Sequence, residues 1–216
     1  VQTCALPICI GSLGASGDLA PLSHMAITLI GEGSIVGDKG ELLDTMDVLT
    51  EKGLIPVELN AKDGLSLING TSQMLSYSII SLTMLNNLLP MADIIYCTSL
   101  DAFKGSLAPF DERVHKVRPH PGQQIVAKRI REIMQGSKIL ESHLECDKVQ
   151  DPYSFRCAPQ VHGAVYEALL SMQSTIQIEM NSTTDNPLVF PSEDGLPSKI
   201  ISQGNFHGEI LALCAD

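Results

Sequence analysis

The stretch GSLGASGDLAP, residues 11–21, combines glycines with a run of small residues, Ala15-Ser16-Gly17. A run without bulky side chains allows one part of the backbone to approach another closely. The Gly17 nitrogen can then reach the Ala15 carbonyl carbon and close a five-membered ring. Loss of water from this ring would leave an electrophilic methylidene group derived from the Ser16 side chain. Asp18 follows immediately and is placed to assist the proton transfers.

A phosphate-binding loop is an alternative explanation for the glycines at positions 11, 14 and 17. Such a loop follows a buried strand and opens a helix within a βαβ unit. The preceding residues, VQTCALPICI, do not resemble a core strand, and no acidic residue follows at the expected distance. We therefore favour the cyclisation hypothesis over a dinucleotide site.

The longer run GSLGASGDLAPLSHMA closely resembles the signature of the aromatic amino acid ammonia-lyases. The resemblance implies that Ala15, Ser16 and Gly17 cyclise autocatalytically to 4-methylidene-imidazol-5-one (MIO), with no external cofactor and no metal. It also implies the long-helix bundle of the fumarase and aspartase superfamily, assembled as a homotetramer.

Residues 1–8, VQTCALPI, fit neither this family nor a targeting sequence. Back-translated, the octapeptide resembles a sequencing-library adapter that is read in frame. We expect residues 1–8 to be such an artefact. We expect residues 9–216 to be a partial lyase domain, truncated at both ends, with the MIO loop and part of the helical core.

A second block, LSLINGTSQ, places Asn69 inside an apolar segment that is expected to be helical. A buried amide without a partner costs on the order of 1 to 3 kcal/mol, so an ordinary, hydrogen-bonded core asparagine is the alternative. The resemblance implies instead that Asn69 contacts the MIO group and the amino side of the substrate. Gly70 would allow the close approach of backbone or ligand.

The block CDKVQDPYSFRC, residues 146–157, concentrates polar functional groups. Tyr153 and Arg156 are three residues apart and would face the same way on one helical turn. The alternative is a simple ion pair between Arg156 and Asp151. The resemblance implies that Arg156 binds the substrate carboxylate through two parallel N–H groups of its guanidinium. It also implies that Tyr153 and Gln150 form hydrogen bonds near the MIO group and substrate.

Two later blocks add candidates. Asn186 lies between Asp185 and Pro187, a position that suits a turn as well as an active-site amide. The resemblance to the family's Asp-Asn-Pro motif supports a substrate-binding role. In GNFHGE, the resemblance implies that Phe206 lines the pocket, with His207 beside it.

A zinc site is a competing interpretation of His143, Cys146, Cys157 and His162, whose spacings resemble those of some metal ligands. The pairing does not follow a common zinc-finger pattern, and the lyase block accounts for the residues between. We therefore expect no metal.

Composition limits the classes of partner. With 25 acidic and 14 basic residues, the net charge of -11 argues against nucleic acid and against an anionic membrane surface. The longest apolar stretch, residues 79–96, contains polar interruptions and predicts a buried core helix rather than a membrane span. The cysteines, an odd number without Cys4, fit reduced thiols in a cytoplasmic protein.

Apolar residues recur at helical spacing along most of the chain. They predict helices over residues 22–30, 42–53, 123–134 and 159–180, a series over residues 61–99 that is broken near Gly64, Gly70 and Pro90, and a helix from Gly204 onward. Residues 103–121 are expected to form a loop. Short hairpins are predicted around Asp38-Lys39-Gly40 and over residues 186–201. The predicted fold class is mainly α, a long-helix bundle with small β-hairpins.

The blocks look most like those of family members that convert L-histidine to trans-urocanate and ammonia. Tyrosine or phenylalanine lyases and MIO-dependent aminomutases are the alternatives, and a non-catalytic helical scaffold is a third. The resemblance places the family's β-proton base, a tyrosine, upstream of the signature and outside this chain. We therefore expect the 216 residues alone to be inactive.

Overall fold

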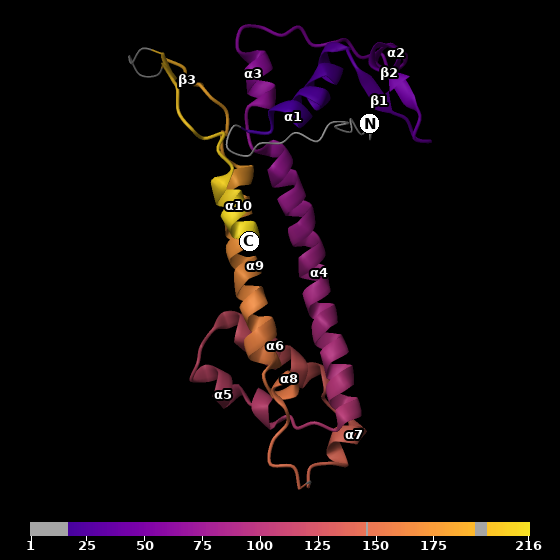
Figure 1. Ribbon diagram of the computed structural model, residues 1–216, viewed down its shortest axis with the longest axis vertical. Helices are drawn as coiled ribbons and strands as arrows, with labels where there is room; N and C mark the ends of the chain where they lie inside the picture. The colour runs from indigo at the N-terminus through magenta and orange to yellow at the C-terminus, as the bar shows by residue number, and fades with distance from the viewer. Residues whose placement is uncertain (1–16, 146, 193–197) are drawn as a thin grey trace. The chain divides into compact units, whose positions relative to one another are not determined.

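The computed structural model describes residues 17–145, 147–192 and 198–216 (Figure 1). The expected artefact at residues 1–8 and two of the expected MIO-forming residues, Ala15 and Ser16, lie outside this part. The described residues are mainly helical with two antiparallel strand pairs, which confirms the predicted fold class. The chain divides into two compact units, each described by itself: Val1–Ser78 with Thr175–Asp216 (unit 1), and Ile79–Ser174 (unit 2).

Unit 1 begins with α1 (Leu19–Ala26), which continues into the 3-10 helix η1 (Ile27–Ile30) and confirms the first predicted helix. The helix α1 packs against α3 (Asp63–Ile68). The predicted break at Gly64 is wrong, because Gly64 lies within α3. The helical series is interrupted at residues 69–71 instead, next to Gly70 as predicted.

Both predicted hairpins are present in unit 1. Strands β1 (Ser34–Val36) and β2 (Leu42–Asp44) pair antiparallel, as do β3 (Leu188–Phe190) and β4 (Lys199–Ile201). The predicted helix over residues 42–53 is correspondingly shorter, since residues 42–44 belong to β2. It becomes α2 (Thr45–Glu51), whose first turn is capped by the Asp44 carboxylate.

The last helix of unit 1, α10 (Glu209–Ala215), begins later than predicted. The residues after Gly204 form a turn instead, in which the His207 N–H donates to the Gly204 carbonyl at 3.0 Å.

The two longest helices are α4 (Ser72–Phe103) and α9 (Ala158–Met180). The helix α9 confirms the prediction for residues 159–180. The predicted break at Pro90 is wrong, because α4 is continuous through it. A proline inside a helix costs roughly 3 kcal/mol. This cost is opposed by contacts on both sides of Pro90: Asp18 binds the first turn of α4, and Leu100 is fully buried near its end.

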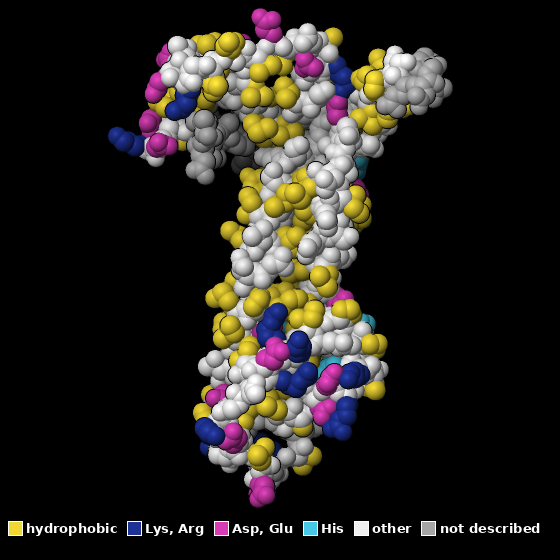
Figure 2. All heavy atoms as spheres, turned by 180° about the vertical axis from the view of Figure 1, so that it is seen from behind, with side chains coloured by type: hydrophobic (Ala, Val, Ile, Leu, Met, Phe, Trp, Pro, Cys, Tyr) yellow, Lys and Arg dark blue, Asp and Glu magenta, His cyan; other side chains and the backbone are white. Residues whose placement is uncertain are grey.

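Much of the surface of α4 is exposed within the single chain, so the expectation of a buried helix at residues 79–96 is wrong for this chain by itself. Its exposed large apolar side chains are Tyr77, Ile80, Met84, Leu85, Leu88, Met91, Ile94, Ile95 and Phe103. Exposed hydrophobic side chains are visible in Figure 2. By length and composition, the segment Asp63–Phe103 could also cross a membrane, with 11% of its most apolar window buried. Core helices of soluble proteins pass the same test, so this is weak evidence for a membrane span.

Unit 2 contains shorter helices around the ends of α4 and α9. They are η2 (Ala108–Phe110), α5 (Glu112–Lys116), α6 (Pro121–Ile133), α7 (Lys138–Glu141) and α8 (Tyr153–Arg156). The helix α6 confirms the prediction for residues 123–134. The prediction of a loop at 103–121 is wrong in part, because η2 and α5 lie within it; Asp111 caps α5 through the Arg113 N–H.

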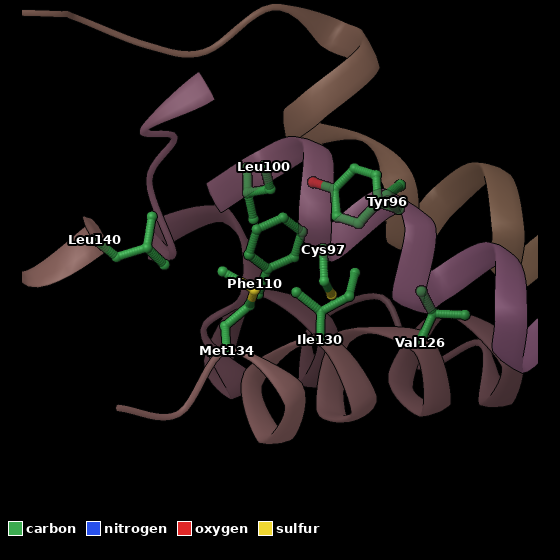
Figure 3. Close-up of a cluster of buried hydrophobic side chains, with 9 residues drawn as sticks. Tyr96, Cys97, Leu100, Phe110, Val126, Ile130, Met134 and Leu140 are labelled. Atoms are coloured by element: carbon green, nitrogen blue, oxygen red, sulfur yellow. The ribbon is translucent and has the colours of Figure 1, made fainter. Parts of the chain in front are cut away.

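The core of unit 2 is a cluster of buried side chains, most of which Figure 3 labels. Its members are Tyr96, Cys97, Leu100, Phe110, Val126, Ile130, Met134, Leu140 and Ala158. In the close-up, Phe110 lies between Leu100 of α4 and the α6 side chain Ile130. Full burial of an aliphatic or aromatic side chain contributes about 1.5 to 3 kcal/mol, so this cluster fixes α4 against α6.

Candidate functional site

Gly17, the last residue of the Ala-Ser-Gly run, must be a glycine for two reasons. Its φ of +81° lies in the left-handed region, which L side chains rarely adopt. A Cβ atom at this position would also lie 2.9 Å from the Gly70 nitrogen and 3.2 Å from Asn69 Oδ1. The sequence predicted that this position needs a backbone without a side chain, and the Asn69-Gly70 segment indeed fills the space that a side chain would take. The structure therefore leaves no room for a side chain at this position.

Asp18 joins the signature to the start of α4. It is fully buried, and its Oδ2 accepts the N–H groups of Gln73 at 3.0 Å and Met74 at 2.9 Å. Its own N–H donates to the Gly70 carbonyl at 2.8 Å. A carboxylate at this position satisfies free N–H groups of the helix and faces the positive end of its dipole. Asp18 therefore anchors the signature to α4; a role in proton transfer stays a prediction.

Asn69 lies at the C-terminal end of α3 rather than inside a helix. It is 8% exposed, and its Nδ2 donates to the backbone oxygen of Asn186 at 3.3 Å. The amide thus has a partner, and it brings two predicted substrate-binding residues together. Gly70 is tightly packed as predicted, since a Cβ atom there would lie 2.8 Å from Thr184 Oγ1.

The turn that carries Asn186 is held by its neighbour Asp185. Lys62 forms an ion pair with the Asp185 carboxylate, and the Ser66 hydroxyl donates to the same oxygen at 3.0 Å. Burial opposes ionisation of Asp185, but the hydrogen bonds from Lys62, the Asn186 N–H and Ser66 outweigh it and lower its pKa. The charge of Asp185 therefore fixes the turn to the first turn of α3.

Sequence reasoning did not identify Lys62 as a site residue. Its partner, Asp185, is 123 positions away in the chain, and a lone lysine gives no local signal for such a contact. Phe206, the remaining predicted residue of unit 1, is partly buried in the turn before α10.

In unit 2, the short helix α8 brings Gln150, Tyr153 and Arg156 together. The Arg156 Nη1 donates to Gln150 Oε1, and the guanidinium carbon lies 4.6 Å from the centre of the Tyr153 ring. The Arg156 Nε is buried and has no hydrogen-bond partner among the described residues. The alternative, an ion pair with Asp151, is not formed: the Asp151 carboxylate accepts the Ser106 N–H at 2.6 Å instead.

The helix α8 is fixed to the core of unit 2. The Tyr96 hydroxyl donates to the Phe155 carbonyl, and burial raises the pKa of Tyr96, with smaller contributions from nearby negative groups. The Phe155 ring stacks on Phe103 with centres 4.4 Å apart. The phenol and guanidinium of α8 are therefore presented from a rigid support.

A cavity of about 630 Å³ lies beside these groups within unit 2. Gln150, Arg156 and Gln160 line it together with the apolar side chains of Leu107 and Met134. Gln160 Oε1 is another buried atom without a partner in the described part of the chain. The cavity combines apolar walls with polar groups that can bind a ligand, as small-molecule sites commonly do.

Two of the residues considered for zinc, His143 and His162, have other contacts. His162 Nδ1 lies 2.7 Å from the buried Asp93 carboxylate, which also pairs with Arg129. His143 lies against the Ser142 hydroxyl, and Cys146 is outside the described residues. Within residues 17–145, 147–192 and 198–216, no group of three or more His, Cys, Asp or Glu side chains could hold a metal ion.

The predicted site residues thus divide between the two units. Unit 1 brings together Gly17, Asp18, Asn69 and Asn186, and it also contains Phe206. Unit 2 brings together Gln150, Tyr153 and Arg156.

Comparison with known proteins shows which family the chain belongs to. A family model described as aromatic amino acid lyase matches residues 6–216. The chain belongs to this family. Histidine ammonia-lyase from Sorangium cellulosum is 50% identical over 208 residues, which cover 95% of this chain and 40% of that protein. The chain thus spans about 40% of the length of such curated relatives.

Solved structures of a lyase and an aminomutase share the fold of this chain. A histidine ammonia-lyase from Trypanosoma cruzi matches with a TM-score of 0.79 and 38% identity, covering 95% of this chain and 37% of that one. A tyrosine aminomutase from Streptomyces globisporus matches with a TM-score of 0.84 and 38% identity, covering 95% and 41%. Both lyases and aminomutases therefore share the architecture of this chain.

Proposed function

We propose that this chain is part of a longer ammonia-lyase that converts L-histidine to trans-urocanate and ammonia. The observation that carries the proposal is the 50% identity to a histidine ammonia-lyase over 95% of the chain. The tightly packed Gly17 backbone, which leaves no room for a Cβ atom, supports cyclisation of Ala15-Ser16-Gly17. When present, the MIO group supplies an electrophilic carbon that makes the amino group of the substrate a better leaving group.

The side chains of this chain would bind and orient the substrate. We propose that Arg156 binds the carboxylate through its guanidinium fork, since its Nε donor is not used by the described residues. Tyr153 and Gln150 lie against that guanidinium and would fix its direction. Asn69 and Asn186 would place amide groups next to the signature, and Phe206, in the same unit, would contact the substrate.

Asp18 would keep the signature in place by holding it on the first turn of α4. The positive end of this helix dipole lies at the same place and favours developing negative charge nearby. The β-proton base is proposed to lie outside these 216 residues. The chain alone is therefore expected to show negligible turnover.

We also propose that the complete enzyme is a cytoplasmic homotetramer. The exposed apolar side chains along α4 support this proposal, because monomeric soluble proteins rarely leave a large contiguous apolar surface in water. Burial of this helix between subunits would remove that surface from solvent. The net charge of -11 supports the absence of nucleic acid and anionic membranes as partners.

An aminomutase that acts on an aromatic amino acid is the second candidate. The specific observation in its favour is the tyrosine aminomutase structure, whose identity to this chain equals that of the Trypanosoma cruzi enzyme, 38%. An aminomutase would return a β-amino acid instead of only the unsaturated acid.

The test uses the complete gene product, purified and incubated separately with L-histidine, L-tyrosine and L-phenylalanine. Ultraviolet absorbance follows the conjugated acid, and mass spectrometry detects any β-amino acid. Urocanate from histidine alone is the expected result. Coumarate or cinnamate, or a β-amino acid, would contradict the proposed substrate or reaction. The Ser16→Ala variant is the control and is expected to fold without turnover.

A further inference from the structure

Gln203 joins two separate segments of unit 1 through hydrogen bonds. Its backbone N–H donates to Asn186 Oδ1 at 2.7 Å, and its side-chain Nε2 donates to the Asp185 carbonyl at 2.5 Å. Its Oε1 accepts the N–H of Asn205. The Ser202 hydroxyl adds a weaker bond to Asn186 Oδ1 at 3.3 Å. The residues after β4 thus hold the turn that carries Asn186.

These contacts determine which way the Asn186 amide faces. A backbone N–H can only donate, so the side-chain atom that faces Gln203 N must be the amide oxygen. The backbone oxygen of Asn186 is also engaged, because it accepts from Asn69 Nδ2 at 3.3 Å. Among the described residues, Asn186 Nδ2 has no acceptor, so the amide offers its N–H groups to a ligand.

The carboxylate next to Asn186 does not compete for these donors. Asp185 Oδ2 is bound by Lys62 and by the Ser66 hydroxyl, and Asp185 Oδ1 accepts the backbone N–H of Asn186. The turn is therefore held from two directions, by α3 on the Asp185 side and by Gln203 on the Asn186 side. Neither Gln203 nor this orientation could be predicted from the Asp-Asn-Pro motif.

An α-amino acid presents two charged groups, an ammonium that only donates and a carboxylate that only accepts. Amide N–H groups can donate hydrogen bonds to the carboxylate but not to the ammonium. A carboxylate has room for several donors, so the Asn186 amide can bind it alongside other donors.

We propose that Gln203 is a positioning residue that holds Asn186 so that its amide N–H groups, and not its amide oxygen, are available to the carboxylate of the substrate. The inference rests on the proposed function, because it takes an α-amino acid as the substrate. Gln203 acts through Asn186 and does not itself contact the substrate.

The test compares three variants of the complete enzyme with the parent. Gln203→Met keeps the length of the side chain and the backbone N–H bond to Asn186 Oδ1. It loses the two side-chain hydrogen bonds, to the Asp185 carbonyl and from the Asn205 N–H, that hold this backbone in place. Gln203→Lys restores a donor for the Asp185 carbonyl. Gln173→Met is the matched control, because Gln173 is exposed on α9. Each protein is assayed for kcat and KM with L-histidine. Inhibition is measured with imidazolepropionate, which has the carboxylate but no amine, and with histamine, which has the amine but no carboxylate.

For Gln203→Met we expect KM for histidine and the inhibition constant of imidazolepropionate to rise about tenfold, the equivalent of one good hydrogen bond. The inhibition constant of histamine should change less than about twofold. The lysine variant should recover part of the loss, and the control should match the parent. Peptide mass spectrometry should show the MIO modification in every protein, and the melting temperatures should remain close.

Equal changes for imidazolepropionate and histamine, or no change for either, would overturn the inference while leaving the proposed function intact. A Gln203→Met protein that fails to fold leaves the lysine variant to decide by the same comparison. A parent enzyme that neither binds nor deaminates histidine would instead overturn the proposed function, and the inference with it.

Discussion

The carboxylate of Asp18 accepts the backbone N–H of Met74 at 2.9 Å, so the signature segment and the first turn of α4 are tied by a buried charge. The same oxygen accepts the Gln73 N–H, and one side chain therefore satisfies two N–H groups that the helix cannot pair itself. The segment that is proposed to cyclise is held at its C-terminal end by this contact.

Replacement of Asp18 separates its anchoring role from a role in proton transfer. Asp18→Ala removes the acceptor and should lower the free energy of unfolding by about 1 kcal/mol, the usual cost of losing a helix cap. Asp18→Asn keeps an oxygen acceptor and should be closer to the parent in stability. If Asp18 also transfers protons during cyclisation, the asparagine variant should fold but lack the modification. Chemical denaturation and peptide mass spectrometry measure the two effects, and an alanine variant as stable as the parent would contradict the anchoring role.

Gly17→Ala should be more damaging than the same change at another left-handed glycine. A Cβ atom at Gly17 meets the Gly70 nitrogen at 2.9 Å, whereas Gly53, with φ +64°, has nothing within 4 Å of such an atom. Gly53→Ala should therefore show only the cost of the left-handed backbone, roughly 1 to 2 kcal/mol. Gly17→Ala adds a steric clash and should lose more. Thermal denaturation of the two variants checks the order, and equal losses would contradict the steric effect expected at Gly17.

The stability of unit 2 should depend on pH through His115. This residue is 2% exposed; its Nε2 lies 3.0 Å from the Pro109 carbonyl and its Nδ1 lies 2.9 Å from the Gln123 amide nitrogen. Because carbonyls accept and the Gln123 nitrogen donates, the ring fits this site as the neutral tautomer with its hydrogen on Nε2. Burial lowers the pKa of His115, against the Pro109 hydrogen bond, which raises it.

Above about pH 6.5 the ring is neutral in both folded and unfolded chains. As the pH falls below that value, His115 binds a proton in the unfolded chain but stays neutral in the folded chain. The free energy of unfolding therefore decreases until the pH reaches the pKa of His115 in the folded chain. His115→Gln should remove this part of the pH dependence. Melting temperatures of parent and variant between pH 7.5 and pH 5.5 test the point, and parallel curves would refute it.

Cys97 should be chemically inert in the folded enzyme. It is 1% exposed in the core of unit 2, and burial, followed by the charge of Asp93, raises its pKa to about 11. Since the thiolate is the reactive form, alkylation at pH 8 should be on the order of 100-fold slower in the native than in the unfolded protein. Iodoacetamide labelling followed by peptide mass spectrometry measures both rates. Comparable rates would mean that this core opens readily.

Local sequence patterns predicted the parts of the fold that depend on local physics. The hydrophobic spacing of residues 123–134 and 159–180 predicted α6 and α9, and the glycine at the Asp38-Lys39-Gly40 turn predicted the first hairpin. The failures arise where distant contacts outweigh local preference. Pro90 does not interrupt α4, because contacts on both sides of it stabilise the helix.

In the candidate site, too, local patterns were predictable and long-range contacts were not. The sequence predicted that a bare backbone is needed at Gly17 and that Tyr153 and Arg156 share one helical turn, and both predictions are confirmed. It could not predict that Asp18 caps a helix more than 50 residues further on, or that Lys62 binds Asp185. Such contacts depend on how the chain returns to unit 1 and leave no local pattern.

The most direct test of the account is the mass of the peptide that contains Ala15, Ser16 and Gly17, isolated from the complete, folded enzyme. The account predicts a mass that is lower than the sequence mass by two water molecules, and the full sequence mass for the same peptide from Ser16→Ala. An unmodified peptide from a folded parent enzyme would contradict the proposed MIO-dependent chemistry.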